Sequence, residues 1–132
     1  MLNLAVRAPL AVALGAIGGA LCRYYIGRWI TLHSFVGGAS AFPIGTFVVN
    51  VSGCLLMGIA AALGNRLDLS SDARLLMTTG GLGAYTTFST YSLETVDLLE
   101  RGRWEMAGAY WMGSAASGLA ALRLGMVLGA WR

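Results

Sequence analysis

The chain has 132 residues, of which 57% are hydrophobic and only 11% are charged. A soluble domain normally carries about 25% charged residues, so this composition excludes an ordinary water-soluble protein. The nine basic residues are all arginines and lie scattered along the chain, whereas a nucleic-acid-binding protein would cluster them on one face. We expect residues 1–132 to form a single membrane domain.

Three stretches are apolar enough to cross a bilayer, which takes about 20 consecutive residues. They are predicted at about 8–30, with Pro9 at a tolerated helix start, at about 42–64, and at about 105–130. The short connection after the second stretch offers Ser70 or Ser71 as the N-cap of the next helix.

The stretch 72–100 is also long enough to cross the bilayer, but its middle is polar and rich in glycine. Irregular backbone at membrane depth is tolerated only where it is buried in protein or lines an aqueous cavity. We therefore predict two half-helices with a break near 80–86, and an all-α integral membrane protein with four transmembrane helices. A short interfacial helix followed by a loop is the alternative.

Small residues recur at a spacing of four in the first and last spans: Gly15 and Gly19, then Ser117, Ala121, Gly125 and Gly129. Such rows let helix backbones approach closely in lipid, either between chains or within one chain. We expect a homo-oligomer, because four short spans bury too little to enclose a pathway alone. The arginines are almost balanced between the two sides, which permits insertion in both orientations and an antiparallel dimer.

Polar residues within the spans indicate passage through the membrane. Thr46 and Asn50 share a helix face, and a membrane asparagine either bonds across helices or faces a polar pathway. Phe88 and Tyr91 share one side of the second half-helix, where positive ring edges attract an anion, although core packing is the alternative. The sequence shows no Ser/His/Asp, Cys/His or metal-ligand pattern, so we predict no enzyme.

Three motifs resemble the CrcB/Fluc family of fluoride channels: Gly18-Gly19-Ala20-x-x-Arg23, Pro43-x-Gly45-Thr46-x-x-x-Asn50, and the glycine-rich stretch with Thr86-Thr87-Phe88-Ser89-Thr90-Tyr91-Ser92-x-Glu94-Thr95. The resemblance covers essentially the whole chain. It implies a dual-topology antiparallel homodimer in the cell membrane that lets fluoride leave passively, with a structural Na⁺ at the dimer centre.

The resemblance also implies roles for individual residues. Backbone carbonyls of Gly83 and Thr86 would hold Na⁺, and Arg23 would lie near the aqueous vestibule. Tyr91 stands where phenylalanine is common in the family, and Ala84 stands where glycine is frequent. The implied fluoride pathway consists of Asn50, Phe88, Ser89, Thr90, Tyr91, Tyr110 and Ser114.

Two other classes of membrane protein are the competing hypotheses. A small multidrug-resistance-type transporter is also a short four-span dimer, but it would place a glutamate in the first span, where this chain has none. A non-transporting assembly subunit would need the rows of small residues but neither the break nor the row of hydroxyls.

Overall fold

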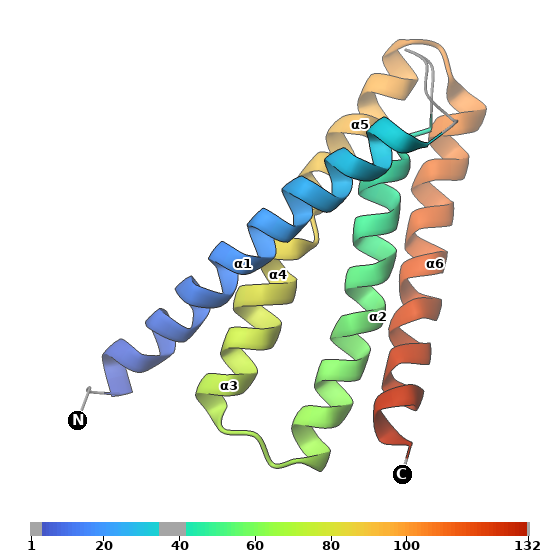
Figure 1. Cartoon of the computed structure of the whole chain (residues 1–132). Helices are drawn as coiled ribbons and strands as arrows, with labels where there is room; N and C mark the ends of the chain where they lie inside the picture. Colours follow the sequence, from blue (N-terminus) through green and yellow to red (C-terminus); the bar gives the residue numbers. More distant parts are fainter. Residues whose placement is uncertain (1–3, 35–41, 132) are drawn as a thin grey trace.

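The computed structural model describes residues 4–34 and 42–131, and over these ranges its regular structure is helical (Figure 1). Three helices are long and apolar enough to cross a membrane: α1 (Leu4–His33), α2 (Ile44–Arg66) and α6 (Trp104–Ala130). At 1.5 Å per residue, the 23 residues of α2 reach about 35 Å, which exceeds the hydrocarbon thickness of about 30 Å. The three predicted apolar spans are therefore confirmed.

The first span is longer than predicted. Helix α1 runs several residues beyond both ends of 8–30, and Pro9 lies inside it rather than at its start. The helix continues through Pro9 because a proline near the N-terminus removes only one backbone hydrogen bond.

The third span is bent, as predicted. It consists of α3 (Ser71–Leu75), the π-helical segment η1 (Leu76–Leu82), α4 (Gly83–Tyr85) and α5 (Phe88–Glu100). The helical path is interrupted at Thr86 and Thr87, at the C-terminal edge of the expected region. The glycines before the interruption remain helical, in contrast to the unwound stretch that their composition suggested. The 13 residues of α5 reach only about 20 Å, so it crosses only part of a bilayer.

The glycines of the bend serve close packing against α1, which runs obliquely across η1 and α4 (Figure 1). A Cβ atom on Gly15 would lie 2.1 Å from the carbonyl oxygen of Leu76, and one on Gly19 would lie 2.0 Å from that of Gly81. Side chains do not fit at this crossing, so the backbones of α1 and η1 are in direct contact. This contact explains why the glycine run stays helical.

Helices α2 and α6 lie side by side and also meet through glycines (Figure 1). A Cβ atom on Gly58 would lie 2.1 Å from the Leu122 carbonyl oxygen, and one on Gly125 would lie 2.1 Å from that of Leu55. The glycines of the small-residue rows in α1 and α6 therefore pack within one chain. Dimerisation consequently needs other surfaces and stays a prediction.

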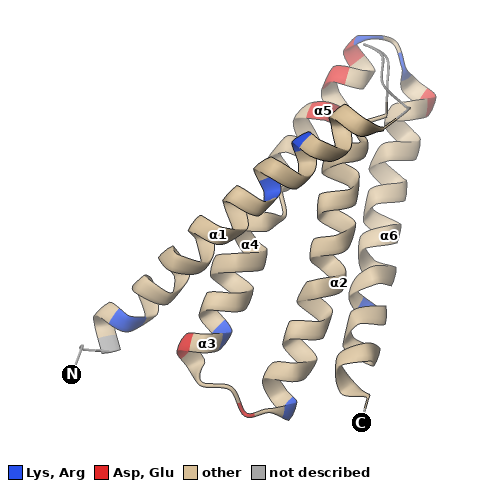
Figure 2. Ribbon diagram, in the orientation of Figure 1, with Lys and Arg blue, Asp and Glu red and all other residues tan. Residues whose placement is uncertain are grey.

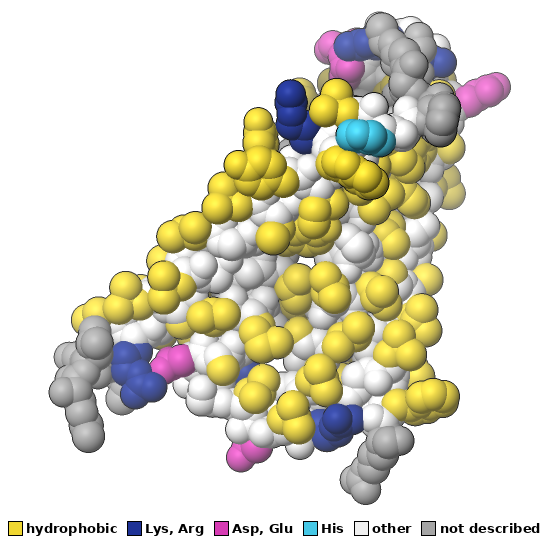
Figure 3. Space-filling model, in the orientation of Figure 1, with side chains coloured by type: hydrophobic (Ala, Val, Ile, Leu, Met, Phe, Trp, Pro, Cys, Tyr) yellow, Lys and Arg dark blue, Asp and Glu magenta, His cyan; other side chains and the backbone are white. Residues whose placement is uncertain are grey.

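Both termini and the connection between α2 and α3 lie at one end of the bundle, as four spans require (Figure 1). At this end Ser70 accepts a hydrogen bond from the Ala73 N–H at 3.3 Å, which confirms it as the N-cap. Arg7 and Asp72 form an ion pair at 2.6 Å there. Most charged side chains lie toward the two ends (Figure 2), and hydrophobic side chains cover much of the visible face between them (Figure 3).

Candidate functional site

The interruption of the third span is held by the side-chain amide of Asn50. Its Nδ2 donates to the Thr87 carbonyl oxygen at 3.1 Å, and its Oδ1 accepts from the Thr87 N–H at 2.8 Å. Thr86 and Thr87 have extended backbone, with ψ angles of 158° and 112°. One side chain thus satisfies both the donor and the acceptor of Thr87, as the interior of a membrane protein requires.

Helix α5 begins directly after this interruption, next to the buried Thr87. Thr87 is the N-cap: its Oγ1 accepts from the Thr90 N–H at 3.3 Å and donates to the Thr90 hydroxyl at 2.9 Å. The aligned peptide dipoles of α5 place partial positive charge at this end, which favours a nearby anion.

A cavity of about 360 Å³ opens beside the N-terminus of α5. Ser114 Oγ is buried and has no hydrogen-bond partner among the described residues. Asn50 uses one Nδ2 hydrogen on Thr87 and keeps the other, so the cavity offers unused donors. The lining comes from α2, the interruption, α5 and α6: Asn50, Cys54, Thr86, Thr87, Phe88, Tyr91, Trp111, Ser114 and Ala115.

The two aromatic residues of the predicted pathway differ in their surroundings. Phe88 is 79% exposed in the single chain, whereas Tyr91 is 7% exposed, and their ring centroids lie 5.6 Å apart. The Tyr91 hydroxyl donates to the Trp111 carbonyl oxygen at 2.8 Å. The hydroxyl that distinguishes Tyr91 from phenylalanine is therefore bound to the backbone of α6.

A second polar cluster lies one turn further along α5, around Glu94. Thr46 Oγ1 donates to one carboxylate oxygen of Glu94 at 2.8 Å, and the Tyr110 hydroxyl donates to the other at 2.7 Å. Tyr110 is fully buried and does not line the cavity. The sequence alone indicates no partner for Glu94, although its spacing of three from Tyr91 places both residues on one side of α5.

Ser89 and Thr90 also lie apart from the cavity lining. Both are exposed in the single chain, in the first turn of α5. The structure therefore brings Asn50, Phe88, Tyr91 and Ser114 together in the cavity and leaves Ser89, Thr90 and Tyr110 outside it.

Of the residues expected to hold Na⁺, Gly83 begins α4 and Thr86 lies in the interruption itself. In a continued helix the Thr87 N–H would bond to the Gly83 carbonyl, but it donates to Asn50 instead. Carbonyls released from a broken helix are suitable Na⁺ ligands, so the chemistry of Gly83 and Thr86 fits the ion. Arg23 also reaches this point, because its Nη1 donates to the Thr86 carbonyl oxygen at 3.4 Å. Side-chain clusters of three or more His, Cys, Asp or Glu are absent from residues 4–34 and 42–131.

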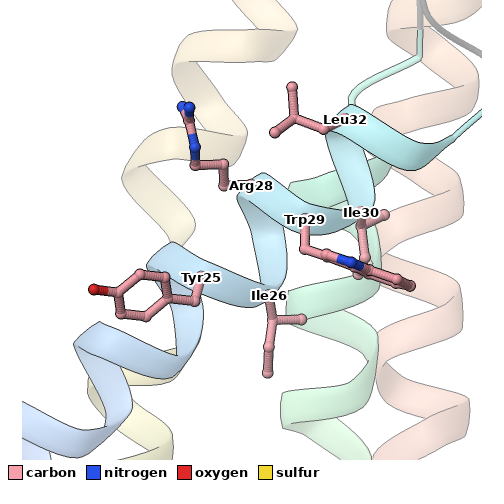
Figure 4. A pocket seen from close by; sticks show the side chains of 6 residues that line it. All are labelled: Tyr25, Ile26, Arg28, Trp29, Ile30 and Leu32. Carbon is pink, nitrogen blue, oxygen red and sulfur yellow. The ribbon is translucent and has the colours of Figure 1, made fainter.

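Another hollow lies along the C-terminal part of α1 (Figure 4). Its lining comes from this helix alone and is mainly apolar, so it is a groove on the outer surface. It contains no predicted pathway residue: it is lined by Tyr25, Ile26, Arg28, Trp29, Ile30 and Leu32.

Three apolar helices, a bent third span and a cavity at the bend that contains several polar groups define a multi-pass membrane protein of the transport type. Residues 10–126 match the family model described as CrcB-like protein, Camphor Resistance (CrcB). The chain belongs to this family, which confirms the resemblance drawn from its motifs.

Three relatives are each named fluoride-specific ion channel FluC. The chain is 43% identical over 135 residues to the protein of Synechococcus sp. (strain JA-2-3B'a(2-13)), with 100% of both chains covered. It is 46% identical to that of Trichormus variabilis, covering 94% of this chain and 89% of the relative. It is 45% identical to that of Chloroflexus aurantiacus, covering 92% and 94%. These names agree with the prediction of a transport protein and not an enzyme.

Proposed function

We propose that the chain is a fluoride-selective channel that lets fluoride leave the cell passively across the cytoplasmic membrane. The observation that carries the proposal is the cavity at the interruption, where unused hydrogen-bond donors meet the N-terminus of α5. The choice of ion is supported by the three relatives named as fluoride-specific channels, which align with at least 92% of this chain.

The donor set suits a small and tightly hydrated anion. A channel must replace the water around such an ion, yet bind it weakly enough to release it. The Ser114 hydroxyl, the second Nδ2 hydrogen of Asn50 and the ring edge of Phe88 are uncharged donors. The residues that line the cavity include no charged side chain, so the cavity itself contains no fixed positive charge that would trap the ion.

The proposed pathway extends from the cavity to Ser89 and Thr90 in the first turn of α5. Tyr91 contributes its ring, since its hydroxyl is bound to Trp111. Tyr110 contributes its hydroxyl only when it leaves Glu94, to which it donates at 2.7 Å. Tyr91, which lines the cavity, and Tyr110, which binds Glu94, are neighbours, with ring centroids 5.2 Å apart.

The proposed assembly is an antiparallel homodimer that contains both orientations of the chain. Support comes from Phe88, Ser89 and Thr90, which are exposed in the single chain although they belong to the proposed pathway. An ion pathway open to hydrocarbon is excluded, so a second copy must cover these residues. The Gly83 and Thr86 carbonyls of both copies would hold the structural Na⁺ between the two chains.

Fluoride efflux from liposomes tests the channel proposal. Purified protein is reconstituted into vesicles loaded with fluoride or chloride, and release is followed with ion-selective electrodes after valinomycin is added. We expect rapid fluoride release with little chloride release. Phe88→Ile should stop the flux, whereas Tyr25→Ile, which removes a 65% exposed aromatic from the outer groove on α1, should leave it unchanged.

Equal release of both anions from the wild-type protein would contradict selectivity. Unchanged fluoride release by Phe88→Ile would show that Phe88 is not part of the pathway. A folded wild-type protein that releases no fluoride would contradict the proposed function itself.

A further inference from the structure

The guanidinium of Arg23 contacts one of the two carbonyls proposed as Na⁺ ligands. Its Nη1 lies 3.4 Å from the Thr86 carbonyl oxygen, and the contact is partly buried. The approach is set by the packing of α1 on η1 and α4, where Gly15 and Gly19 bring the backbones together. The fold therefore places Arg23 within reach of the Thr86 carbonyl.

The Thr86 carbonyl is the one hydrogen-bond acceptor of Arg23 among the residues that the structure describes. The ion pairs found there use other arginines, in Arg7–Asp72 and Arg101–Asp97. A charged group within a membrane span needs a counter-ion or a backbone carbonyl, and Arg23 has a carbonyl. The guanidinium thus brings an uncompensated positive charge to the interruption.

We propose that Arg23 and Na⁺ compete for the interruption: the guanidinium binds the Thr86 carbonyl when Na⁺ is absent and weakens Na⁺ binding when the ion is present. The inference rests on the proposed Na⁺ site. Two cations that share one carbonyl oxygen lie roughly 5 Å apart, and at that separation their repulsion weakens Na⁺ binding by about 10- to 300-fold. Arg23 thus acts on Na⁺ through the shared Thr86 carbonyl and lowers the Na⁺ affinity of the site.

Thermal unfolding across a Na⁺ titration tests the competition without measuring flux. The full-length protein in detergent is heated while its tryptophan fluorescence is recorded, with N-methylglucamine replacing Na⁺ at constant ionic strength. A ligand that binds the native state raises the unfolding temperature as its concentration passes the dissociation constant. We expect Arg23→Gln to lower the Na⁺ concentration of half-maximal stabilisation by about tenfold or more.

Arg28→Gln is the matched control, because it removes the same charge from the same helix and has no hydrogen bond to the interruption among the described contacts. It should leave the half-maximal Na⁺ concentration within about twofold of the wild-type value, since exposed charges at a distance are screened. Should Arg23→Gln not fold, Arg23→Leu removes the charge with a side chain that membrane helices accept.

An unchanged or higher half-maximal Na⁺ concentration in the neutral variants would overturn the inference. If Na⁺ raises the unfolding temperature of Arg23→Gln but leaves that of the wild type unchanged, the inference is supported in its strongest form. If no variant responds to Na⁺, both the competition and the Na⁺ site are wrong. Fluoride efflux from the same preparations then shows separately whether the channel proposal stands.

Discussion

Replacing Asn50 by leucine should destabilise the protein, because the side-chain hydrogen bonds that hold the interruption of the third span are lost. Leucine has the same branched arrangement of side-chain heavy atoms as asparagine but no hydrogen-bonding group, so it removes both bonds to Thr87. Its two methyl groups are bulkier than the amide and add some crowding. Asn50→Asp is the graded companion, because it keeps the acceptor for the Thr87 N–H and loses the donor to the Thr87 carbonyl.

The magnitude follows from the burial of Thr87, which is 8% exposed and has little access to water. Each buried backbone group left without a partner costs about 1–3 kcal/mol, so two groups cost about 2–6 kcal/mol. Hydrogen bonds measured within a membrane protein average about 0.6 kcal/mol, which favours the lower half of this range. We therefore expect Asn50→Leu to reduce the free energy of unfolding by about 2–4 kcal/mol.

The assay is reversible unfolding in mixed micelles, with helix content followed by circular dichroism as denaturing detergent is added. Cys54→Ala is the control, because Cys54 is one turn further along α2 and lines the same cavity. It should lose about 1 kcal/mol or less, the cost of a small truncation. If Asn50→Leu were no less stable than Cys54→Ala, the conclusion that the amide holds the interruption would be refuted.

Three further predictions test the packing and the polar clusters. Gly19→Ala would place a Cβ atom 2.0 Å from the backbone of Gly81 and should lower the free energy of unfolding by about 1–3 kcal/mol. Gly18→Ala is the control: its Cβ would meet nothing within 4 Å, so it should be neutral or slightly stabilising. Equal unfolding midpoints of the two variants would contradict the close crossing of α1 and η1. Tyr91→Phe loses the hydrogen bond to the Trp111 carbonyl and should lower the free energy of unfolding by about 0.5–1.5 kcal/mol, with fluoride efflux retained. A loss of efflux would show that the Tyr91 hydroxyl takes part in fluoride passage. Glu94→Gln leaves one acceptor oxygen for the two hydroxyl donors, Thr46 and Tyr110, and should lower the free energy of unfolding by about 1–3 kcal/mol. A variant as stable as the wild type would show that these hydrogen bonds do not stabilise the protein.

The spans were predictable because a lipid environment requires long apolar stretches, and such stretches are visible in the sequence. The predicted 42–64 and the observed Ile44–Arg66 differ by two residues at each end. The state of the glycine run was not predictable in the same way. Glycine permits both an unwound backbone and a close helix crossing, and the choice depends on α1, which is far away in sequence.

The roles of the predicted pathway residues stay predictions, and the sequence indicated which residues have polar surroundings better than it indicated their contacts. The shared face of Thr46 and Asn50 indicated that both have polar partners, and each has one. The partners themselves, Glu94 for Thr46 and the Thr87 backbone for Asn50, come from elements that only the tertiary fold brings together. The direction of the Tyr91 hydroxyl likewise depends on the position of α6.

Selective fluoride permeation is the central claim, and a reversal potential in a planar bilayer tests it most directly. A tenfold fluoride gradient is set against an opposite tenfold chloride gradient, and the voltage of zero current is measured. A fluoride-selective channel should reverse near the fluoride equilibrium potential, about 59 mV in magnitude for a single charge. Reversal near zero would show an anion pathway without selectivity, and reversal at about 59 mV of the opposite sign would show a chloride channel; either result would contradict the account.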